Sequence, residues 1–246
     1  MNGTVYLIGA GPGDPELITL KALNVIKKAD VIIYDRLIPK ELLDYAPIEA
    51  EKIYVGKIPQ KNTITQDQIN QLLVQKAKEY NIVVRLKGGD PLLFGRGGEE
   101  IQYLHEAQIL HQVIPGITSV QAASASFCIP FTHRKIASSI AIVTGHEDPS
   151  KEDNYVNWHK IAKAVDTIII LMGIKHLKMI IDCIIASDID RNTKVAIIEN
   201  VTKPGQRIII GNLNNIINKA AKINIRAPSV IIIGKVVNSF KTLVKI

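Results

Sequence analysis

The sequence contains only two cysteines among its 246 residues, Cys128 and Cys183, and they lie far apart in the chain. There is no Cys-x-x-Cys pair and no cluster of cysteine with histidine, so neither a disulfide framework nor a zinc site is indicated. A chain of this length buries enough surface to fold without such cross-links. We therefore expect a self-sufficient globular protein that holds no metal.

Long apolar runs are also lacking, since none approaches the ~20 residues that a membrane-spanning helix needs. The chain passes from Met1 directly into strand-like residues 5–8 without a basic leader, and we expect no membrane insertion and a cytoplasmic location. The net charge is +7, but the basic residues are scattered and no aromatic-basic pattern typical of nucleic-acid binding occurs. The charge therefore favours an anionic small-molecule partner over nucleic acid.

Short apolar runs rich in β-branched residues alternate with segments of helical periodicity, which predicts an α/β protein. The predicted strands are residues 4–9, 31–34, 53–55, 82–86 and 111–114, followed by 139–144, 167–172, 194–199, 207–210 and 229–233. A stretch of loop-forming residues around Pro115 and Gly116 separates the two sets of strands. We therefore expect two α/β domains, residues 1–116 and 117–246.

Two segments carry the signals of a helix start. Asp14, Pro15 and Glu16 supply an N-cap, a proline at the first helical position and an acidic first turn. Thr65 and Gln68 have the spacing of a capping box. Both helices are expected to pack on a sheet through an apolar stripe. The stripe residues are Leu17, Leu20, Leu23 and Ile26 in the first helix and Ile69, Leu72, Leu73 and Ala77 in the second.

A glycine-rich turn, residues 9–13, follows the first predicted strand, and in this context glycines let a backbone approach a nucleotide closely. The third glycine of the dinucleotide fingerprint is absent because position 14 is Asp, whose charge repels a pyrophosphate at a helix N-terminus. Asp35, at the end of the second predicted strand, nevertheless keeps a nicotinamide-dependent oxidoreductase open as an alternative. A turn that binds no ligand is a further alternative.

A second glycine-rich segment follows the fourth predicted strand. Residues 88–98 contain five glycines, which predicts a wall where backbone lies against a ligand. Asp35 and Arg36 follow one predicted strand and Gly56 and Lys57 follow the next. Ligands of open parallel sheets gather at the carboxyl ends of the strands, so these side chains are candidates for a site, although an ordinary surface ion pair is the alternative.

Ordered blocks along nearly the whole chain resemble the tetrapyrrole methylase family. These blocks are residues 5–19, 34–37, 55–57, 85–100, 113–119, 130–134, 144–146 and 171–173. The resemblance implies two α/β domains with S-adenosylmethionine in the cleft between them, usually in a homodimer. The activity it implies is the transfer of two methyl groups to carbons of uroporphyrinogen III, an acidic tetrapyrrole, to give precorrin-2 for sirohaem and cobalamin biosynthesis.

The same resemblance implies roles for individual residues. Asp35 is the implied proton acceptor and Lys57 the implied proton donor, while Arg36 and His133 remain alternatives for the proton transfers. The implied cofactor contacts are Pro12, Gly88, Gly89, Asp90, Leu93, Thr118, Ser119, Met172 and Val201. At the last of these positions the family usually has a small residue, whereas this chain has valine. Candidate partners for the substrate carboxylates are Arg36, Arg96 and Arg134.

Three other functions stay open on the sequence alone. A methylase of a later tetrapyrrole precursor would have the same cofactor site and differ only in its substrate. A nicotinamide-dependent oxidoreductase would use the turn at residues 9–13 and bind a dinucleotide. A third alternative is a protein that binds an anionic tetrapyrrole without chemistry, and its binding would be unaffected by the change Asp35→Ala.

Overall fold

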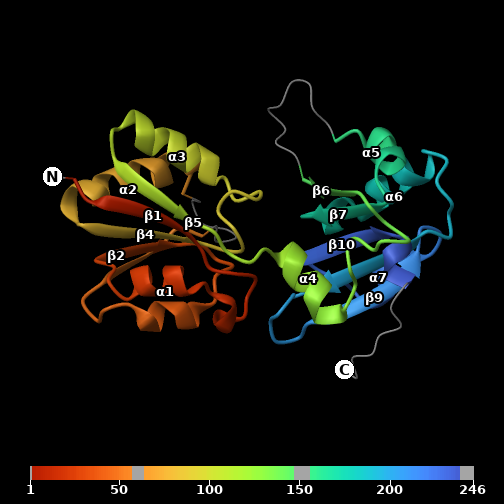
Figure 1. Ribbon diagram of the computed structural model, residues 1–246, viewed down its shortest axis with the longest axis horizontal. Coiled ribbons are helices and arrows are strands. Elements are labelled where there is room, and N and C mark those ends of the chain that lie inside the picture. The colour runs from red at the N-terminus through yellow and green to blue at the C-terminus, as the bar shows by residue number, and fades with distance from the viewer. Residues whose placement is uncertain (1, 57–63, 147–155, 239–246) are drawn as a thin grey trace. The chain divides into compact units, whose positions relative to one another are not determined.

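The structure is a computed structural model that describes residues 2–56, 64–146 and 156–238 (Figure 1). The chain divides into two compact units, Met1–Ser119 and Val120–Ile246. The first unit contains one five-stranded sheet and the second contains another. The ten strands that the sequence predicts are all present, and the two-sheet α/β class is confirmed.

The sheet of the first unit has the strand order β3-β2-β4-β1-β5, and its neighbouring strands are parallel. The strands are β1 (Thr4–Gly9), β2 (Val31–Tyr34), β3 (Glu51–Tyr54), β4 (Ile82–Lys87) and β5 (Leu110–Ile114). Leu7 of β1 lies opposite Arg85 of β4 and Val113 of β5. Apart from Arg85 and Lys87 of β4, the central strands are largely apolar on both sides because helices cover both faces of the sheet.

The helices on the two faces belong to two separate cores (Figure 1). They are α1 (Leu20–Ile26), α2 (Gln66–Glu79) and α3 (Gly97–Glu106), with 3-10 turns η1 (Pro15–Leu17) and η2 (Lys40–Tyr45). Ile26 of α1 packs with Ile8 of β1 in one core. Leu73 of α2 and Leu104 of α3 pack with Leu7 of β1 in the other. Consecutive residues of β1 therefore serve opposite faces, as the alternation of side chains along a strand requires.

The predicted cap at Asp14 is confirmed, with Pro15 and Glu16 in the first turn, but the prediction of one continuous helix from there is wrong. Asp14 caps only the short turn η1, where its Oδ1 accepts a hydrogen bond from Glu16 N at 2.9 Å. Helix α1 begins after a second cap, Thr19, whose Oγ1 accepts from Ala22 N at 3.2 Å. The interruption turns Leu20 outward, and this residue is 80% exposed.

The second predicted helix start is confirmed. Thr65 Oγ1 accepts a hydrogen bond from Gln68 N at 3.2 Å, and Gln68 Oε1 accepts from Thr65 N at 2.8 Å. These two bonds satisfy donors at the N-terminus of α2 that have no partner inside the helix. Ile69, Leu73 and Ala77 are buried on one face of α2, at the predicted spacing.

The second unit contains a mixed sheet in the order β6-β7-β10-β8-β9. Its strands are β6 (Ile140–Thr144), β7 (Thr167–Leu171), β8 (Lys194–Glu199), β9 (Arg207–Asn212) and β10 (Ser229–Gly234). Its helices are α4 (Ser119–Phe127), α5 (Trp158–Ala164), α6 (Leu177–Ile185) and α7 (Ile216–Lys222), with 3-10 turns η3 (Ile174–His176) and η4 (Lys235–Asn238). Trp158, Ile181 and Ile216 bring α5, α6 and α7 into one core with Ile231 of β10.

Strand direction in this sheet decides which loops share an edge. β6 and β7 are parallel, whereas β10 is antiparallel to both β7 and β8. β7 and β8 therefore run in the same direction, and the loops that follow β6, β7 and β8 leave the sheet at one edge. Within the described ranges, no helix combines the length and the apolar character that a membrane crossing requires.

Candidate functional site

The order of strands in the first sheet creates a topological switch point between β1 and β4. These strands are neighbours, but the chain leaves β1 through α1 toward β2 and leaves β4 through α3 toward β5, on opposite faces of the sheet. Ligands of open α/β sheets bind outside the carboxyl ends of the strands at such a point. Both glycine-rich loops found in the sequence, after β1 and after β4, start there.

The glycines at this edge let three loops touch through their backbones. Gly11 N donates to Gly89 O at 3.2 Å and Gly89 N donates to Gly11 O at 2.7 Å, which joins the loops after β1 and β4. A Cβ added to Gly9 would lie 2.5 Å from both Gly89 O and Gly116 N. The loop after β5 is thus packed against the other two, and part of the glycine content serves this close packing rather than a ligand.

Replacing Gly116 with Ala is expected to lower the free energy of unfolding by about 1–3 kcal/mol, the usual range for overpacking. The added Cβ would lie 2.2 Å from Gly89 O and 2.7 Å from the Cα of Gly9, and these atoms belong to backbone that is itself hydrogen-bonded. Chemical denaturation measures the change. Gly98→Ala in α3 is the matched control, since its added Cβ meets nothing within 4 Å, and equal unfolding energies for the two variants would contradict the prediction.

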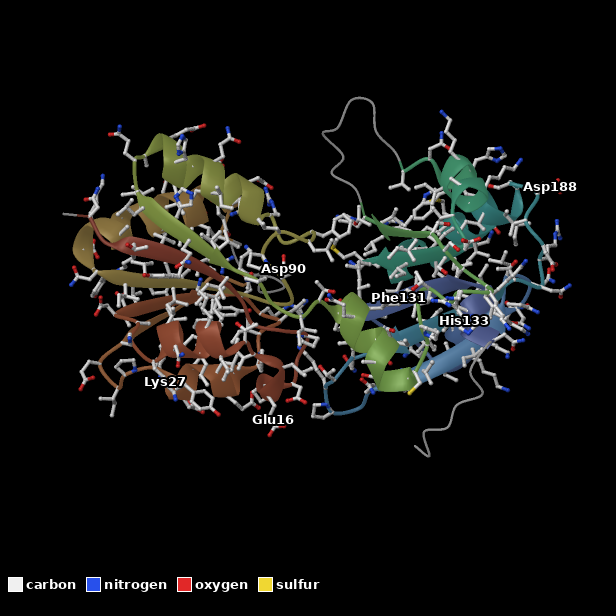
Figure 2. All side chains as sticks on the ribbon, in the orientation of Figure 1. Glu16, Lys27, Asp90, Phe131, His133 and Asp188 are labelled. Carbon is white, nitrogen blue, oxygen red and sulfur yellow. The ribbon has the colours of Figure 1, made fainter. Side chains whose placement is uncertain are left out.

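The carboxylate of Asp90 ties the loop after β4 to itself and to the loop after β5 (Figure 2). Asp90 Oδ1 accepts from Leu92 N at 2.8 Å and from Leu93 N at 3.2 Å, and Oδ2 accepts from Gly116 N at 3.1 Å. Both oxygens of this predicted cofactor contact are therefore engaged with backbone amides. Its side chain orders the loop, and the backbone of the loop is the part that can face a ligand.

Open space lies on the other side of this loop, beside Gly89. Gly89 has a φ of +68°, and a Cβ placed on it would meet only the Cα of Thr118, at 3.9 Å. Gly88 is half-buried next to Leu37, whose Cβ lies 3.2 Å from the position of an added Cβ. The structure thus brings Gly89 and Thr118, two predicted cofactor contacts, close to each other.

A buried ionic cluster lies directly behind this edge. Arg85 of β4 is 1% exposed and joins two carboxylates, with its Nη2 at 2.7 Å from Asp35 Oδ1 and its Nε at 3.0 Å from Glu100 Oε1. Lys87 Nζ lies 2.8 Å from the same oxygen of Glu100, which also accepts from Gln66 Nε2 at 3.2 Å. Glu100 Oε2 is buried and has no hydrogen-bond partner among the residues that the structure describes.

The charges of the cluster compensate one another, two cations against two anions. Burial by itself lowers the pKa of Arg85, but the nearby charges of Glu100 and Asp35 outweigh it and raise that pKa above its ordinary value. Burial and the neighbouring Arg85 together lower the pKa of Lys87, against the opposing effect of Glu100. Arg85 is thus a permanent cation here, held in place by carboxylates on two sides.

Sequence reasoning missed Arg85, Lys87 and Glu100 as parts of the site. The available signal was two basic residues inside an otherwise apolar strand, residues 82–87, together with an acidic residue in the helix that follows. A charged side chain in a strand covered on both faces needs a buried partner. That signal indicates a buried ion pair between β4 and α3. Which acidic residue of α3 is the partner depends on which face of the helix packs on the sheet.

The remaining predicted residues of the first unit lie on loops at the carboxyl edge of its sheet or just after it. Pro12, Leu93, Thr118 and Ser119 are half-buried, and Arg36 and Arg96 are exposed. Arg96 forms a bidentate ion pair with Glu99, with Nε to Oε1 at 2.7 Å and Nη2 to Oε2 at 2.6 Å. The side chain of Asp35 is 31% exposed, so it reaches both the cluster and the surface. Lys57, the implied proton donor, lies outside the described residues.

In the second unit, Met172 and Val201 follow β7 and β8 at one edge of the sheet. The ends of the two strands are level, because Leu171 of β7 and Ile198 of β8 both lie opposite Val230 of β10. Met172 is 48% exposed, whereas Val201 is 6% exposed. The valine that replaces the usual small residue therefore points its side chain into the protein, and its backbone remains at the edge.

Arg134 belongs to a loop anchored at the opposite edge of that sheet. In this loop Phe131 O accepts from Oγ1 of Thr167, the first residue of β7, at 2.9 Å (Figure 2). Ser138 N donates to the carboxylate of Asp166, just before β7, at 2.8 Å. The structure thus does not bring the loop of Arg134 to the edge that carries Met172.

The nicotinamide alternative requires a helix that begins directly after the glycine turn, so that its N-terminus meets the pyrophosphate. The turn is followed instead by η1, and α1 starts only at Leu20 behind its own cap, Thr19. The carboxylate of Asp14 occupies the start of η1. This arrangement lacks the helix N-terminus that binds a dinucleotide.

Comparisons with known proteins agree with the arrangement of the two sheets. The family model of tetrapyrrole (corrin/porphyrin) methylases matches residues 4–217. The uroporphyrinogen-III C-methyltransferase of Methanocaldococcus jannaschii is 52% identical over 97% of this chain and 98% of its own length. The crystal structure of uroporphyrin-III C-methyl transferase from Thermus thermophilus with S-adenyl homocysteine is 38% identical and covers 97% of this chain and 100% of its own, with a TM-score of 0.84.

A solved cobalt precorrin-4 methyltransferase shares the fold equally well, with a TM-score of 0.84, but is only 25% identical over 95% of each chain. Fold similarity alone therefore does not separate substrates among these enzymes. With a family model that spans most of the sequence and a relative more than half identical over nearly its full length, the chain belongs to the tetrapyrrole (corrin/porphyrin) methylase family.

Proposed function

We propose that this protein transfers methyl groups from S-adenosylmethionine to carbons of uroporphyrinogen III, twice per substrate, to give precorrin-2. The observation that carries the proposal is the 52% identity to a uroporphyrinogen-III C-methyltransferase over nearly the full length of both chains. The related structure with bound S-adenyl homocysteine supports the choice of methyl donor. The net charge of +7 suits a substrate with many carboxylates.

The proposed cofactor contacts lie at the loop edges of the two sheets. In the first unit they are Pro12, Gly88, Gly89, Asp90, Leu93, Thr118 and Ser119, and in the second they are Met172 and Val201. The open space beside Gly89 supports a backbone contact there, and the exposed side chain of Met172 is free to cover a ligand. At Val201 and Asp90 the contact is assigned to the backbone, since both side chains are otherwise engaged.

S-adenosylmethionine supplies, when bound, a methyl group that its sulfonium already makes electrophilic. The protein needs no nucleophile of its own, and alignment of donor and acceptor contributes about 7–11 kcal/mol in well-oriented reactions. A pyrrole carbon of the substrate forms the new carbon–carbon bond, the carbon–sulfur bond breaks, and its electron pair remains on sulfur. The methylated substrate is then cationic and must lose a proton.

Asp35 is the proposed acceptor of that proton. Its carboxylate is partly exposed and is held through Oδ1 by Arg85, which leaves Oδ2 without a hydrogen-bond partner among the described residues.

Lys57 is the proposed donor on the basis of the family resemblance. Arg36 is exposed next to Asp35 and is the proposed first partner of a substrate carboxylate. Arg96 and Arg134 are retained as proposed partners, and a homodimer is proposed as the assembly.

The test is an anaerobic incubation of the purified protein with uroporphyrinogen III and S-adenosylmethionine, analysed by mass spectrometry. The expected product carries two added methyl groups. No added methyl group, together with tight binding of S-adenosylhomocysteine, would move the substrate to a later tetrapyrrole precursor. Binding of a nicotinamide dinucleotide and not of S-adenosylhomocysteine would refute the methylase proposal.

A further inference from the structure

We infer that Arg85, anchored by Glu100, is a positioning residue that fixes the carboxylate of Asp35 for proton transfer. The inference rests on the proposed function, because it assigns Asp35 the role of proton acceptor. Arg85 itself is buried and acts through Asp35 rather than on the substrate.

The guanidinium of Arg85 is held on every side. Its Nε bonds Glu100 at 3.0 Å and its Nη2 bonds Asp35 at 2.7 Å. Its Nη1 lies 3.4 Å from Ile33 O and 3.5 Å from Leu86 O. Because the group is planar, contacts in these directions leave it no freedom to rotate. Only 2% of the side chain is exposed, so water does not compete for its donors.

Glu100 supplies the anchor from a different element. It lies on α3, is fully buried, and binds Lys87 as well as Arg85 through Oε1. The anchor is thereby connected to two residues of β4, and the position of Arg85 depends on how α3 packs on the sheet. A carboxylate on the surface would hold a guanidinium far less firmly, since exposed ion pairs contribute only about 0–1 kcal/mol.

Asp35 gains a defined direction from this arrangement. It follows β2 on a loop, and 31% of its side chain is exposed, so without a fixed partner its carboxylate would sample several rotamers. The bond from Arg85 holds Oδ1 and leaves Oδ2 as the oxygen available for a proton. General-base catalysis depends on such placement within hydrogen-bond reach of the proton.

The variant Arg85→Lys tests the inference, because it keeps the positive charge and removes the planar fork. We expect kcat for methyl transfer to uroporphyrinogen III to fall about 10- to 100-fold, within the range by which positioned acid–base groups contribute. The KM for S-adenosylmethionine is expected to stay unchanged, since no cofactor contact is altered.

A double-mutant cycle separates positioning from general damage. In an Asp35→Asn background, Arg85→Lys is expected to cause little further loss of kcat, because the two residues act as one unit. Glu100→Asp shortens the anchor while keeping its charge, and it is expected to lower kcat without changing KM. Lys76→Met is the control, since it removes an ion pair with Glu51 at the amino end of β3, and its kcat is expected to match the wild type.

The inference is overturned if Arg85→Lys leaves kcat unchanged. It is also overturned if Arg85→Lys lowers kcat by the same factor in the wild-type and Asp35→Asn backgrounds, or if the KM for S-adenosylmethionine rises along with the loss of kcat. Failure of the proposed function looks different, because the wild-type protein itself would then add no methyl group to uroporphyrinogen III.

Discussion

Replacing Asp35 with Asn is expected to lower kcat for methyl transfer by about 10²- to 10⁴-fold, the usual contribution of a positioned acid–base group. Asn has nearly the same size and can still accept the hydrogen bond that Arg85 Nη2 donates to Oδ1 at 2.7 Å. Its amide cannot take up a proton at neutral pH, so the cationic methylated substrate loses its acceptor. The fold is expected to persist because Asp35 lies at a partly exposed loop position.

The measurement is single-turnover methylation of uroporphyrinogen III alongside calorimetric titration with S-adenosylhomocysteine. Binding is expected to remain within about twofold of the wild type, because the change leaves the proposed cofactor loops untouched. Asp44→Asn is the matched control, an exposed aspartate of η2 in the same unit, and it should retain wild-type kcat. Equal activity of the two variants would remove Asp35 from the proposed role.

Replacing Glu100 with Gln is expected to lower the free energy of unfolding by about 3–5 kcal/mol, the cost of breaking a buried ion pair from one side. Glu100 is fully buried, and its Oε1 receives hydrogen bonds from Arg85, Lys87 and Gln66. The neutral amide leaves two buried cations with the charge of Asp35 alone. The amide oxygen can still accept the three bonds at Oε1, but the NH2 group would then lie at the position of Oε2, where no described residue offers a partner, and its buried donors would stay unsatisfied.

The loss in free energy of unfolding is measured by urea denaturation monitored with circular dichroism. The neighbouring variant Glu99→Gln provides the control, because Glu99 also forms an ion pair with an arginine but is 52% exposed, as is Arg96. That surface pair is expected to contribute no more than about 1 kcal/mol. A Glu100 variant no less stable than the Glu99 variant would show that the buried cluster does not stabilise the fold.

Much of the fold follows from local patterns in the chain. Most of the ten strands are runs of apolar and β-branched residues, and such runs need no long-range information to indicate a strand. The capping box of Thr65 and Gln68 is equally local, since both bonds span three residues. The glycine loops after β1 and β4 could be placed at a ligand-binding edge because parallel strands end at a common edge.

Other features depended on contacts that the local pattern does not contain. The apolar spacing of Leu17, Leu20, Leu23 and Ile26 suited one continuous helix, yet Thr19 competes as a cap and breaks it, leaving Leu20 exposed. The position of the loop of Arg134 also came only from the structure, in which bonds to Thr167 and Asp166 hold this loop near the start of β7. The pattern of residues in a loop does not indicate which edge of the sheet the loop reaches.

The sequence by itself determined the two sets of strands, the glycine loops and the family to which the chain belongs, because these depend on residue types at short spacing. Only the tertiary structure decided that Arg85 meets Asp35, 50 residues away in sequence, and Glu100, 15 residues away. The tertiary structure likewise decided that Asp90 accepts a hydrogen bond from Gly116 in the loop after β5 and that the side chain of Val201 is buried. Such pairs form because strand order and helix packing bring distant segments together, and a buried charge is stable only where that packing supplies its partner.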